Sequence, residues 1–177
     1  MGTSIMSKTI WPMTKVAIVA LIGAFLLWIS LIGPIVHKSD VVTTPIPLVN
    51  GQTLDLKVLR GKVVVLNFWS PDCPPCIHEL PELERLYQSY RSQGLVVVGI
   101  ATPGSSKSKS LAAAAMAQVT YPLSVDQRGT IARAVGGIMV TPTQVIIDKE
   151  GHVIDKYQGV VSGQEPMDEI LRALHQR

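Results

Sequence analysis

The sequence predicts an α/β fold with a mixed central β-sheet and flanking helices, preceded by one N-terminal transmembrane helix. Two continuous apolar runs, residues 63–68 and 95–100, have the composition of strands that are buried on both faces. A helix-periodic segment joins them, which predicts a right-handed connection between parallel strands. Two further strand-like runs near the C-terminus are separated by a glycine-containing turn, which adds an antiparallel pair to the sheet.

The N-terminal part contains the predicted membrane anchor. No charged residue occurs from Val16 to Val36, and these 21 positions match the roughly 20 residues that cross a bilayer as a helix. A cleaved signal peptide is one alternative, although its apolar core runs only about 7–15 residues. A buried core helix is another. We predict four segments: a cytoplasmic N-terminus over 1–15, an anchor over 16–36, a tether over 37–47 and a globular domain over 48–177.

The distribution of charge predicts the orientation of the anchor. Lys8 and Lys15 precede it, and the positive-inside rule keeps such a flank in the cytoplasm. The domain then faces the periplasm or the cell exterior, where disulfides persist, as part of a single-pass protein of the cytoplasmic (inner) membrane. Residues 1–39 carry the whole net charge of +3. The neutral remainder has no basic stripe, so nothing favours binding to a nucleic acid.

The elements of the domain follow from periodicity and turn residues. After the first strand, apolar residues recur every three or four positions and mark one buried helix face: Ile77, Leu80, Leu83, Leu86, Tyr87 and Tyr90. The later segments are predicted as two helices, a hairpin and an amphipathic closing helix. Their ranges are 107–118 and 128–135 for the helices, 143–148 and 152–157 for the hairpin strands, and 165–176 for the last helix.

The chain's two cysteines lie where the first strand gives way to the helix. Unpaired amides and the dipole at a helix start favour thiolate over thiol, so Cys73 is the expected nucleophile. Pro74 fits the first helical turn, where its missing N–H has no partner to lose. Cys76, one turn deeper, is the expected resolving thiol. A disulfide closing so short a loop removes little chain entropy, so a purely structural role explains the pair poorly.

Glu79 and Pro142 are the other candidates for the site. Glu79 lies three residues beyond Cys76, on roughly the same side of the helix, where it could accept the proton of the resolving thiol. Burial there would raise its pKa. A solvated surface glutamate is the alternative, and the spacing leaves both open. Pro142 enters the third predicted strand, and the spacing does not distinguish a cis from a trans peptide bond.

A Cys-x-x-Cys pair is also half of a zinc site, which needs two more ligands. The candidate ligands are His37, His78, His152 and His175, none of which is paired at the usual His-x3–5-His spacing. We therefore predict no metal and no cofactor, only a redox-active Cys73–Cys76 disulfide.

The segment from Asn67 to Cys76, together with Glu79 and Pro81, resembles the active-site segment of the membrane-anchored thioredoxin-like proteins of the TlpA/ResA type. Residues 61–67 resemble the family's lead-in strand, and residues 141–151 resemble its proline loop and hairpin. The resemblance covers about residues 42–175 and implies a thioredoxin-like fold. Asn67 stands where cytosolic thioredoxins keep a buried aspartate.

The resemblance also implies roles for individual residues. Cys73 attacks, Cys76 resolves, and Glu79 is a functional carboxylate. The residues implied to contact the substrate are Trp69, Pro74, Pro75, Thr141 and Pro142, with Pro142 as the cis-proline and the Thr141 backbone receiving the partner chain. Asp72 departs from the family, which usually has an aromatic residue before the first cysteine. A carboxylate there opposes thiolate formation, which fits a reductant.

The implied function is a membrane-tethered thiol-disulfide oxidoreductase. It would reduce disulfides in exported client proteins, apocytochrome c in cytochrome c maturation being the first to consider, and would be recharged by an integral-membrane electron donor. Three alternatives stay open: a copper or metal chaperone using the same thiols, an oxidant of exported thiols, and a peroxidase. The copper-delivering relatives typically use a longer Cys-x3-Cys spacing, and the peroxidases need a different neighbourhood around the nucleophile.

Overall fold

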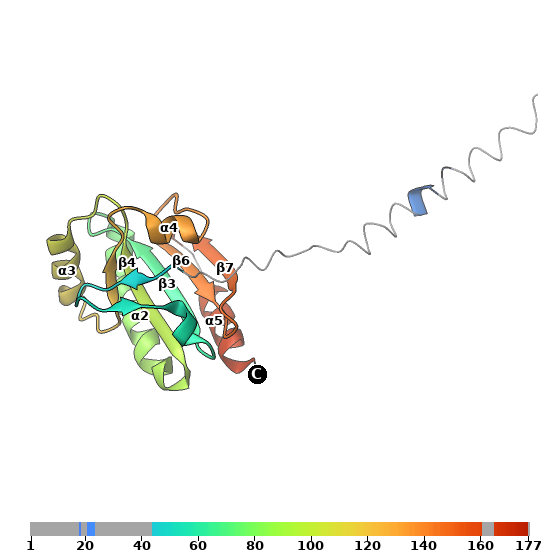
Figure 1. Ribbon diagram of the computed structural model, residues 1–177, viewed down its shortest axis with the longest axis horizontal. Helices are drawn as coiled ribbons and strands as arrows, with labels where there is room; N and C mark the ends of the chain where they lie inside the picture. Colours follow the sequence, from blue (N-terminus) through green and yellow to red (C-terminus); the bar gives the residue numbers. More distant parts are fainter. Residues whose placement is uncertain (1–17, 19–20, 24–43, 161–164, 177) are drawn as a thin grey trace, which may run out of the picture. The chain divides into compact units, whose positions relative to one another are not determined.

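Strand β3 (Val63–Trp69) is the centre of the sheet in the computed structural model, which describes residues 18, 21–23, 44–160 and 165–176. The five-stranded sheet has the order β5-β4-β3-β6-β7 (Figure 1). The neighbours on one side, β4 (Leu95–Ala101) and β5 (Leu123–Val125), run parallel to β3. On the other side β6 (Thr143–Ile147) is antiparallel to β3, and β7 (Val153–Gln158) is antiparallel to β6. The predicted mixed sheet is confirmed.

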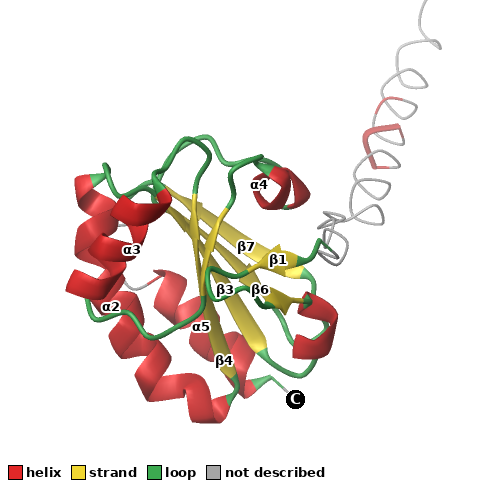
Figure 2. Cartoon of the chain, turned by 60° about the vertical axis from the view of Figure 1, so that its left-hand side comes forward, coloured by secondary structure: helices red, strands yellow, loops and turns green. Residues whose placement is uncertain are grey.

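The helices cover both faces of this sheet (Figure 2). On one face, α2 (Pro74–Tyr90), α3 (Lys107–Met116) and α5 (Glu165–His175) contribute to the core. On the other, α4 (Thr130–Ala134) and the short helix η1 (Leu56–Leu59) contribute. A second short helix, η2 (Arg91–Gln93), follows α2. The four helices predicted for the globular domain are present, each within a few residues of its predicted range.

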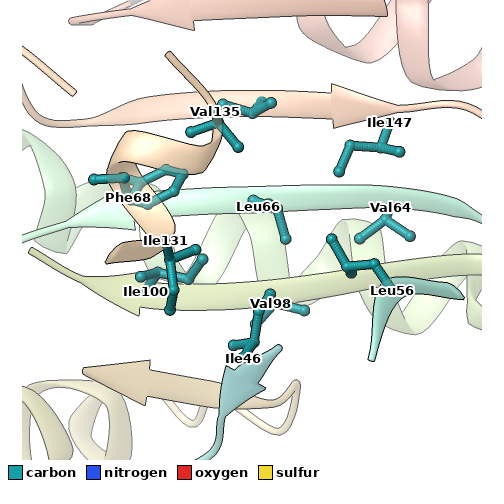
Figure 3. Packing of buried hydrophobic residues seen from close by; sticks show 12 residues of the cluster. Ile46, Leu56, Val64, Leu66, Phe68, Val98, Ile100, Ile131, Val135 and Ile147 are labelled. Atoms are coloured by element: carbon teal, nitrogen blue, oxygen red, sulfur yellow. The ribbon is translucent and has the colours of Figure 1, made fainter. Parts of the chain in front are cut away.

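Alternation along β3 separates the two halves of the core. Val64, Leu66 and Phe68 point to the side of α4 and η1. Figure 3 shows Phe68 beside Ile131 and Val135, and Val64 at the other end of the strand near Leu56 and Ile147. Val63 and Val65 point to the opposite side, towards residues of α2 and α5. Because every residue of β3 is buried, the continuous apolar run of the sequence corresponds to burial on both faces.

A two-stranded hairpin lies beside the β5 edge of the sheet. Its strands are β1 (Ile46–Pro47) and β2 (Thr53–Leu54). The Val49 amide donates a hydrogen bond to the Leu123 carbonyl at 2.9 Å, and Ser124 Oγ donates to the Pro47 carbonyl at 2.7 Å. Ile46 and Pro47, the last two residues of the predicted tether, are therefore paired with the hairpin strand β2.

Replacing Ile46 by alanine tests this boundary. Ile46 is fully buried in the core cluster that contains Leu66 and Phe68. We expect Ile46→Ala to lower the free energy of unfolding by about 2–5 kcal/mol, the usual cost of truncating a buried isoleucine. Urea unfolding of the full chain measures it. Val58→Ala, at a side chain that is 72% exposed, is the matched control and should change stability by less than about 0.5 kcal/mol. Equal changes in the free energy of unfolding for the two variants would indicate that residue 46 belongs to the tether.

The hairpin of β6 and β7 is fastened at both ends. At one end the Gly159 amide donates to the Pro142 carbonyl at 2.7 Å. At the other, the turn uses Gly151 at a φ of +82°, a conformation that favours glycine. Lys149 Nζ in the same turn donates to the carbonyls of Leu174 and Gln176, at 2.7 and 2.5 Å. A cation there satisfies carbonyls that the end of α5 leaves without intrahelical partners.

The predicted N-terminal segments fall almost entirely outside the described residues. This applies to the cytoplasmic segment 1–15, to most of the tether, and to the anchor 16–36 except residues 18 and 21–23, which are helical. Within the described part of the chain, no helix combines the length and apolar character needed to span a bilayer.

Candidate active site

The two cysteines lie at the junction of β3 and α2 and form a disulfide, with their Cα atoms 5.3 Å apart. Cys73 is the N-cap of α2, in an extended conformation at φ −110° and ψ 101°. The Cys76 amide donates to Cys73 Sγ at 3.3 Å, so the sulfur takes the place that a Ser or Asp oxygen takes in an ordinary N-cap. The predicted placement of Cys73 at the helix start is confirmed.

Pro74 and Pro75 occupy the first two positions of α2. Neither has an N–H, so the Cys76 amide is the first free backbone donor of the helix. The next amide, of Ile77, donates to the Cys73 carbonyl at 3.2 Å. The Cys73 sulfur therefore receives one amide hydrogen bond where an ordinary helix start offers several unpaired donors.

The two sulfurs differ in accessibility. Cys76 is fully buried among Trp69, Leu80 and Ala101, whereas Cys73 is partly exposed at the edge of this cluster. Only Cys73 is therefore open to a macromolecular partner.

The loop before β6 faces the disulfide. The Thr141–Pro142 peptide bond is cis, as the resemblance implies. Cys73 Sγ lies 3.6 Å from the Thr141 carbonyl oxygen, although 68 residues separate the two in the chain. The adjacent pairing of β3 and β6 brings them together, because Cys73 follows one strand and Thr141 precedes the other.

A pocket of about 490 Å³ lies beside this contact, and we call it the outer pocket. Its lining residues are Pro74, Pro75, His78, Glu79, Glu82, Pro142 and Val160. Three apolar side chains near it are exposed: Met139, Val140 and Val160. The outer pocket thus includes three of the predicted substrate-contacting residues, while Trp69, a fourth, is buried behind Cys76 and cannot touch a partner from its present position.

Glu79 lies on the inner side of the outer pocket and is partly buried. Its Oε1 accepts a hydrogen bond of 2.5 Å from Gln144 Nε2 of β6. Its Oε2 is buried and has no hydrogen-bond partner among the described residues. Burial raises the pKa of Glu79, the Gln144 hydrogen bond lowers it, and the charge of Glu82 raises it, with a net rise. Glu79 is therefore not the solvated glutamate of the alternative interpretation.

Gln144 is a site residue that sequence reasoning missed. It is buried, and it lies in register between Asn67 of β3 and Tyr157 of β7. The available signal was a long polar residue directly before the apolar residues 145–147 of β6, in a predicted central strand where a buried polar group needs a partner. Asn67, fully buried beside it, has neither side-chain atom hydrogen-bonded to a described residue.

Asp72 has a partner that its sequence position does not reveal. Lys109 Nζ of α3 lies 3.1 Å from Asp72 Oδ1, and both side chains are about two-thirds exposed. The lysine opposes the effect of the carboxylate on Cys73, but pairs this exposed are weak and screened by salt.

Asp72→Asn and Lys109→Met form a matched pair of tests. In the reduced chain, removing the carboxylate should shift the pH profile of Cys73 alkylation to lower pH, and removing the lysine should shift it to higher pH. Each shift should be below about one pH unit, because both charges face solvent. Alkylation rates measured across the pH range at low salt report the two midpoints. Shifts of the same sign would show that the substitutions act through structure rather than charge.

The described residues also contain a group of potential metal ligands away from the disulfide. Asp148, Glu150 and His152 lie together at the turn between β6 and β7, with ligand atoms within 4.8 Å of one another. Neither cysteine belongs to this group.

Comparison with protein families identifies a match to the AhpC/TSA family over residues 41–156. The thiol-disulfide oxidoreductase ResA of Bacillus thuringiensis is 30% identical over 131 residues, which cover 70% of each chain. The thioredoxin-like protein YneN of Bacillus subtilis is 31% identical over 117 residues, covering 66% of this chain and 68% of its own.

A solved structure shares the fold as well. The thiol:disulfide interchange protein of the thioredoxin family from Chlorobium tepidum superposes with a TM-score of 0.64 at 27% identity. The match covers 77% of this chain and 99% of that protein.

Proposed function

Because the chain belongs to the AhpC/TSA family and is a thiol-disulfide oxidoreductase, we propose that it reduces disulfide bonds of exported proteins through Cys73 and Cys76. One observation carries the proposal. The partly exposed sulfur of Cys73 lies at the N-cap of α2 and 3.6 Å from the Thr141 carbonyl, with the Cys76 sulfur buried behind it. This arrangement admits a partner to one sulfur only.

The reaction begins with the dithiol form. The Cys73 thiolate, stabilised by the Cys76 amide and the helix dipole, attacks one sulfur of the client disulfide. A mixed disulfide forms, and the other client sulfur leaves as a thiolate. The Thr141 backbone and the outer pocket hold the client segment beside Cys73.

The second step releases the client. Glu79, three residues from Cys76 on the same side of α2, accepts the proton of the Cys76 thiol. The Cys76 thiolate then attacks Cys73, the Cys73–Cys76 bond forms, and the bond to the client breaks. Two electrons pass to the client, and the chain ends in the disulfide form. The dithiol supplies both electrons, so the proposed reaction uses no further cofactor.

The proline pair supports a reducing direction. A thiolate at a helix start is stabilised by free amides, and a more strongly stabilised thiolate makes a stronger oxidant. Pro74 and Pro75 remove two of these donors, and Asp72 adds a negative charge nearby. Both features disfavour the Cys73 thiolate and so favour transfer of electrons to the client.

The proposed setting is the outer face of the cytoplasmic membrane. Residues 16–36, free of charge over 21 positions, would serve as the anchor, with the domain facing the periplasm or the exterior. An integral-membrane donor would return electrons to the disulfide. Apocytochrome c, with its paired haem-attachment cysteines, is the client that we propose first.

Reduction of a protein disulfide by the full chain tests this function. The dithiol form should reduce insulin catalytically when a chemical reductant regenerates it, and alkylation of Cys73 should abolish the activity. Equilibration with glutathione buffers gives the direction, and a reductant should lie towards the −270 mV end of the roughly −120 to −270 mV range of such proteins. A value at the oxidising end would favour an oxidant of exported thiols instead.

A further inference from the structure

Gln144 has no part in the exchange reaction described above, although it contacts one of the groups that take part. We infer that the Gln144 amide is a positioning residue that holds the Glu79 carboxylate where it receives the proton of Cys76. The inference rests on the proposed thiol-disulfide exchange.

The contact is short, buried and made by a rigid element. Gln144 Nε2 donates to Glu79 Oε1 at 2.5 Å, and Gln144 is only 8% exposed. It lies in β6, whose backbone is paired on both sides, with β3 and β7. A side chain held in this way has little freedom, so it can fix the orientation of the carboxyl group that it binds.

The carboxyl group is held by one oxygen only. Gln144 engages Oε1, while Oε2 is buried and lacks a hydrogen-bond partner among the described residues. A group that accepts a proton needs a free oxygen in a defined position. Because an amide does not titrate, Gln144 can hold Oε1 without competing for the proton.

The contact also ties the carboxyl group to a second space beside α2. Besides the outer pocket, Glu79 lines a second hollow of about 150 Å³, which we call the inner cavity. This cavity lies between α2 and α5, with Gln144 and Met167 in its wall. Gln144 lines the inner cavity and not the outer pocket. The hydrogen bond therefore keeps Glu79 in contact with a space that a client in the outer pocket does not fill, through which the proton can leave while the mixed disulfide persists.

Several ionisable groups lie around Glu79 and Gln144. The charge of Glu82 raises the pKa of Glu79, and the charge of Glu79 raises the pKa of Tyr121, which precedes β5. His78 lines the outer pocket together with Glu79, Cys76 lies one turn earlier on α2, and Tyr157 is the cross-strand neighbour of Gln144 on β7. The residues of α5 that line the inner cavity are uncharged. Among these influences, Gln144 is the one hydrogen bond that favours the ionised form of Glu79 and lowers its pKa.

Gln144→Met tests the inference, because methionine nearly keeps the volume and lacks the donor. The reduced full chain is mixed with Ellman's reagent, which releases one coloured thiolate when Cys73 attacks and a second when Cys76 resolves the adduct. At about pH 7 the second phase should slow about tenfold, because losing the hydrogen bond raises the pKa of Glu79. The rate should recover at alkaline pH, where a thiol ionises without a general base. The first phase should be unchanged.

Two further variants separate positioning from a structural effect. In a Glu79→Gln background, Gln144→Met should slow the second phase no further, since both act through one carboxylate. Gln158→Met, on the exposed end of β7, is the control for the substitution type and should change neither phase.

Three results would overturn the inference: equal slowing at every pH, slowing by the same factor without Glu79, or no slowing at all. A first phase no faster than the reaction of an ordinary thiol would instead contradict the proposed function. The two failures are therefore distinguishable.

Discussion

Cys76→Ser should accumulate client proteins in disulfide linkage to Cys73, whereas Cys73→Ser should accumulate none and should lose reductase turnover by at least about 10³-fold. The burial of Cys76 and the exposure of Cys73 explain the difference. Without the buried thiol the mixed disulfide has no internal nucleophile to break it. Without the exposed thiol, no sulfur at the outer pocket can attack.

Non-reducing electrophoresis of the full chain, after expression with its natural exported partners, shows whether adducts form. Reducing agent should release them, and mass spectrometry of the released proteins identifies the clients. The double variant lacking both cysteines is the control for non-covalent association. Adducts in Cys73→Ser and none in Cys76→Ser would reverse the two roles, and full turnover in both variants would remove the pair from the reaction.

Glu79→Gln should slow the resolving step about 10²-fold near neutral pH, the lower end of what a general base contributes. Glutamine keeps the volume, and its carbonyl can still accept the hydrogen bond from Gln144, so the substitution removes the proton acceptor with little change in shape. The same two-phase measurement with Ellman's reagent isolates this step. Glu82→Gln makes the same substitution at a neighbouring glutamate of α2 and serves as the comparison for Glu79→Gln. The charge of Glu82 raises the pKa of Glu79, so removing it should move the profile slightly to lower pH.

Glu79→Gln should also stabilise the fold. The direction of the change in the free energy of unfolding follows from the raised pKa of Glu79. This pKa is raised in the folded chain above its ordinary value of 4.5, so the folded state holds the proton more tightly than the unfolded state. That contribution to stability is complete below the unfolded pKa and is lost as pH rises through the folded pKa. Glu79→Gln should therefore gain more stability relative to wild type at about pH 8 than at about pH 4, by urea unfolding. A gain that is independent of pH would contradict the burial of an ionising carboxyl.

The sequence predicted the elements that have a strong period or a continuous apolar run, and it missed the shortest ones. β3 and β4 follow from their valine-rich runs, and α2 from its apolar spacing. β5, three residues long, has too few positions to show a period. β1 consists of Ile46 and Pro47 directly after Pro45, a proline-rich sequence that usually marks a tether. Ile46 is buried only because the hairpin pairs at the β5 edge, a contact between distant parts of the chain.

The site likewise has features that the sequence predicted and contacts that it did not. The motif placed Cys73, Cys76 and Pro142, since strand ends, helix starts and proline positions are local features. The contacts that adjust their chemistry are not local. Gln144 and Glu79 are 65 residues apart, and Asp72 and Lys109 are 37 apart. No pattern within one element connects either pair, so only the folded sheet and helices reveal them.

The hydrogen bonds at both ends of the β6–β7 hairpin determine whether this protein or its client must change shape when the two bind. Pro142 is tied to Gly159 at one end of the hairpin, and Lys149 is tied to the close of α5 at the other. The surface next to Cys73 is therefore rigid and changes little when a client binds. A disulfide presented on a stiff, fully folded protein would meet steric resistance there, whereas one in a pliable, extended segment could align with the Thr141 backbone. Selectivity at this surface would thus depend first on the conformational flexibility of the client segment and only second on its side chains.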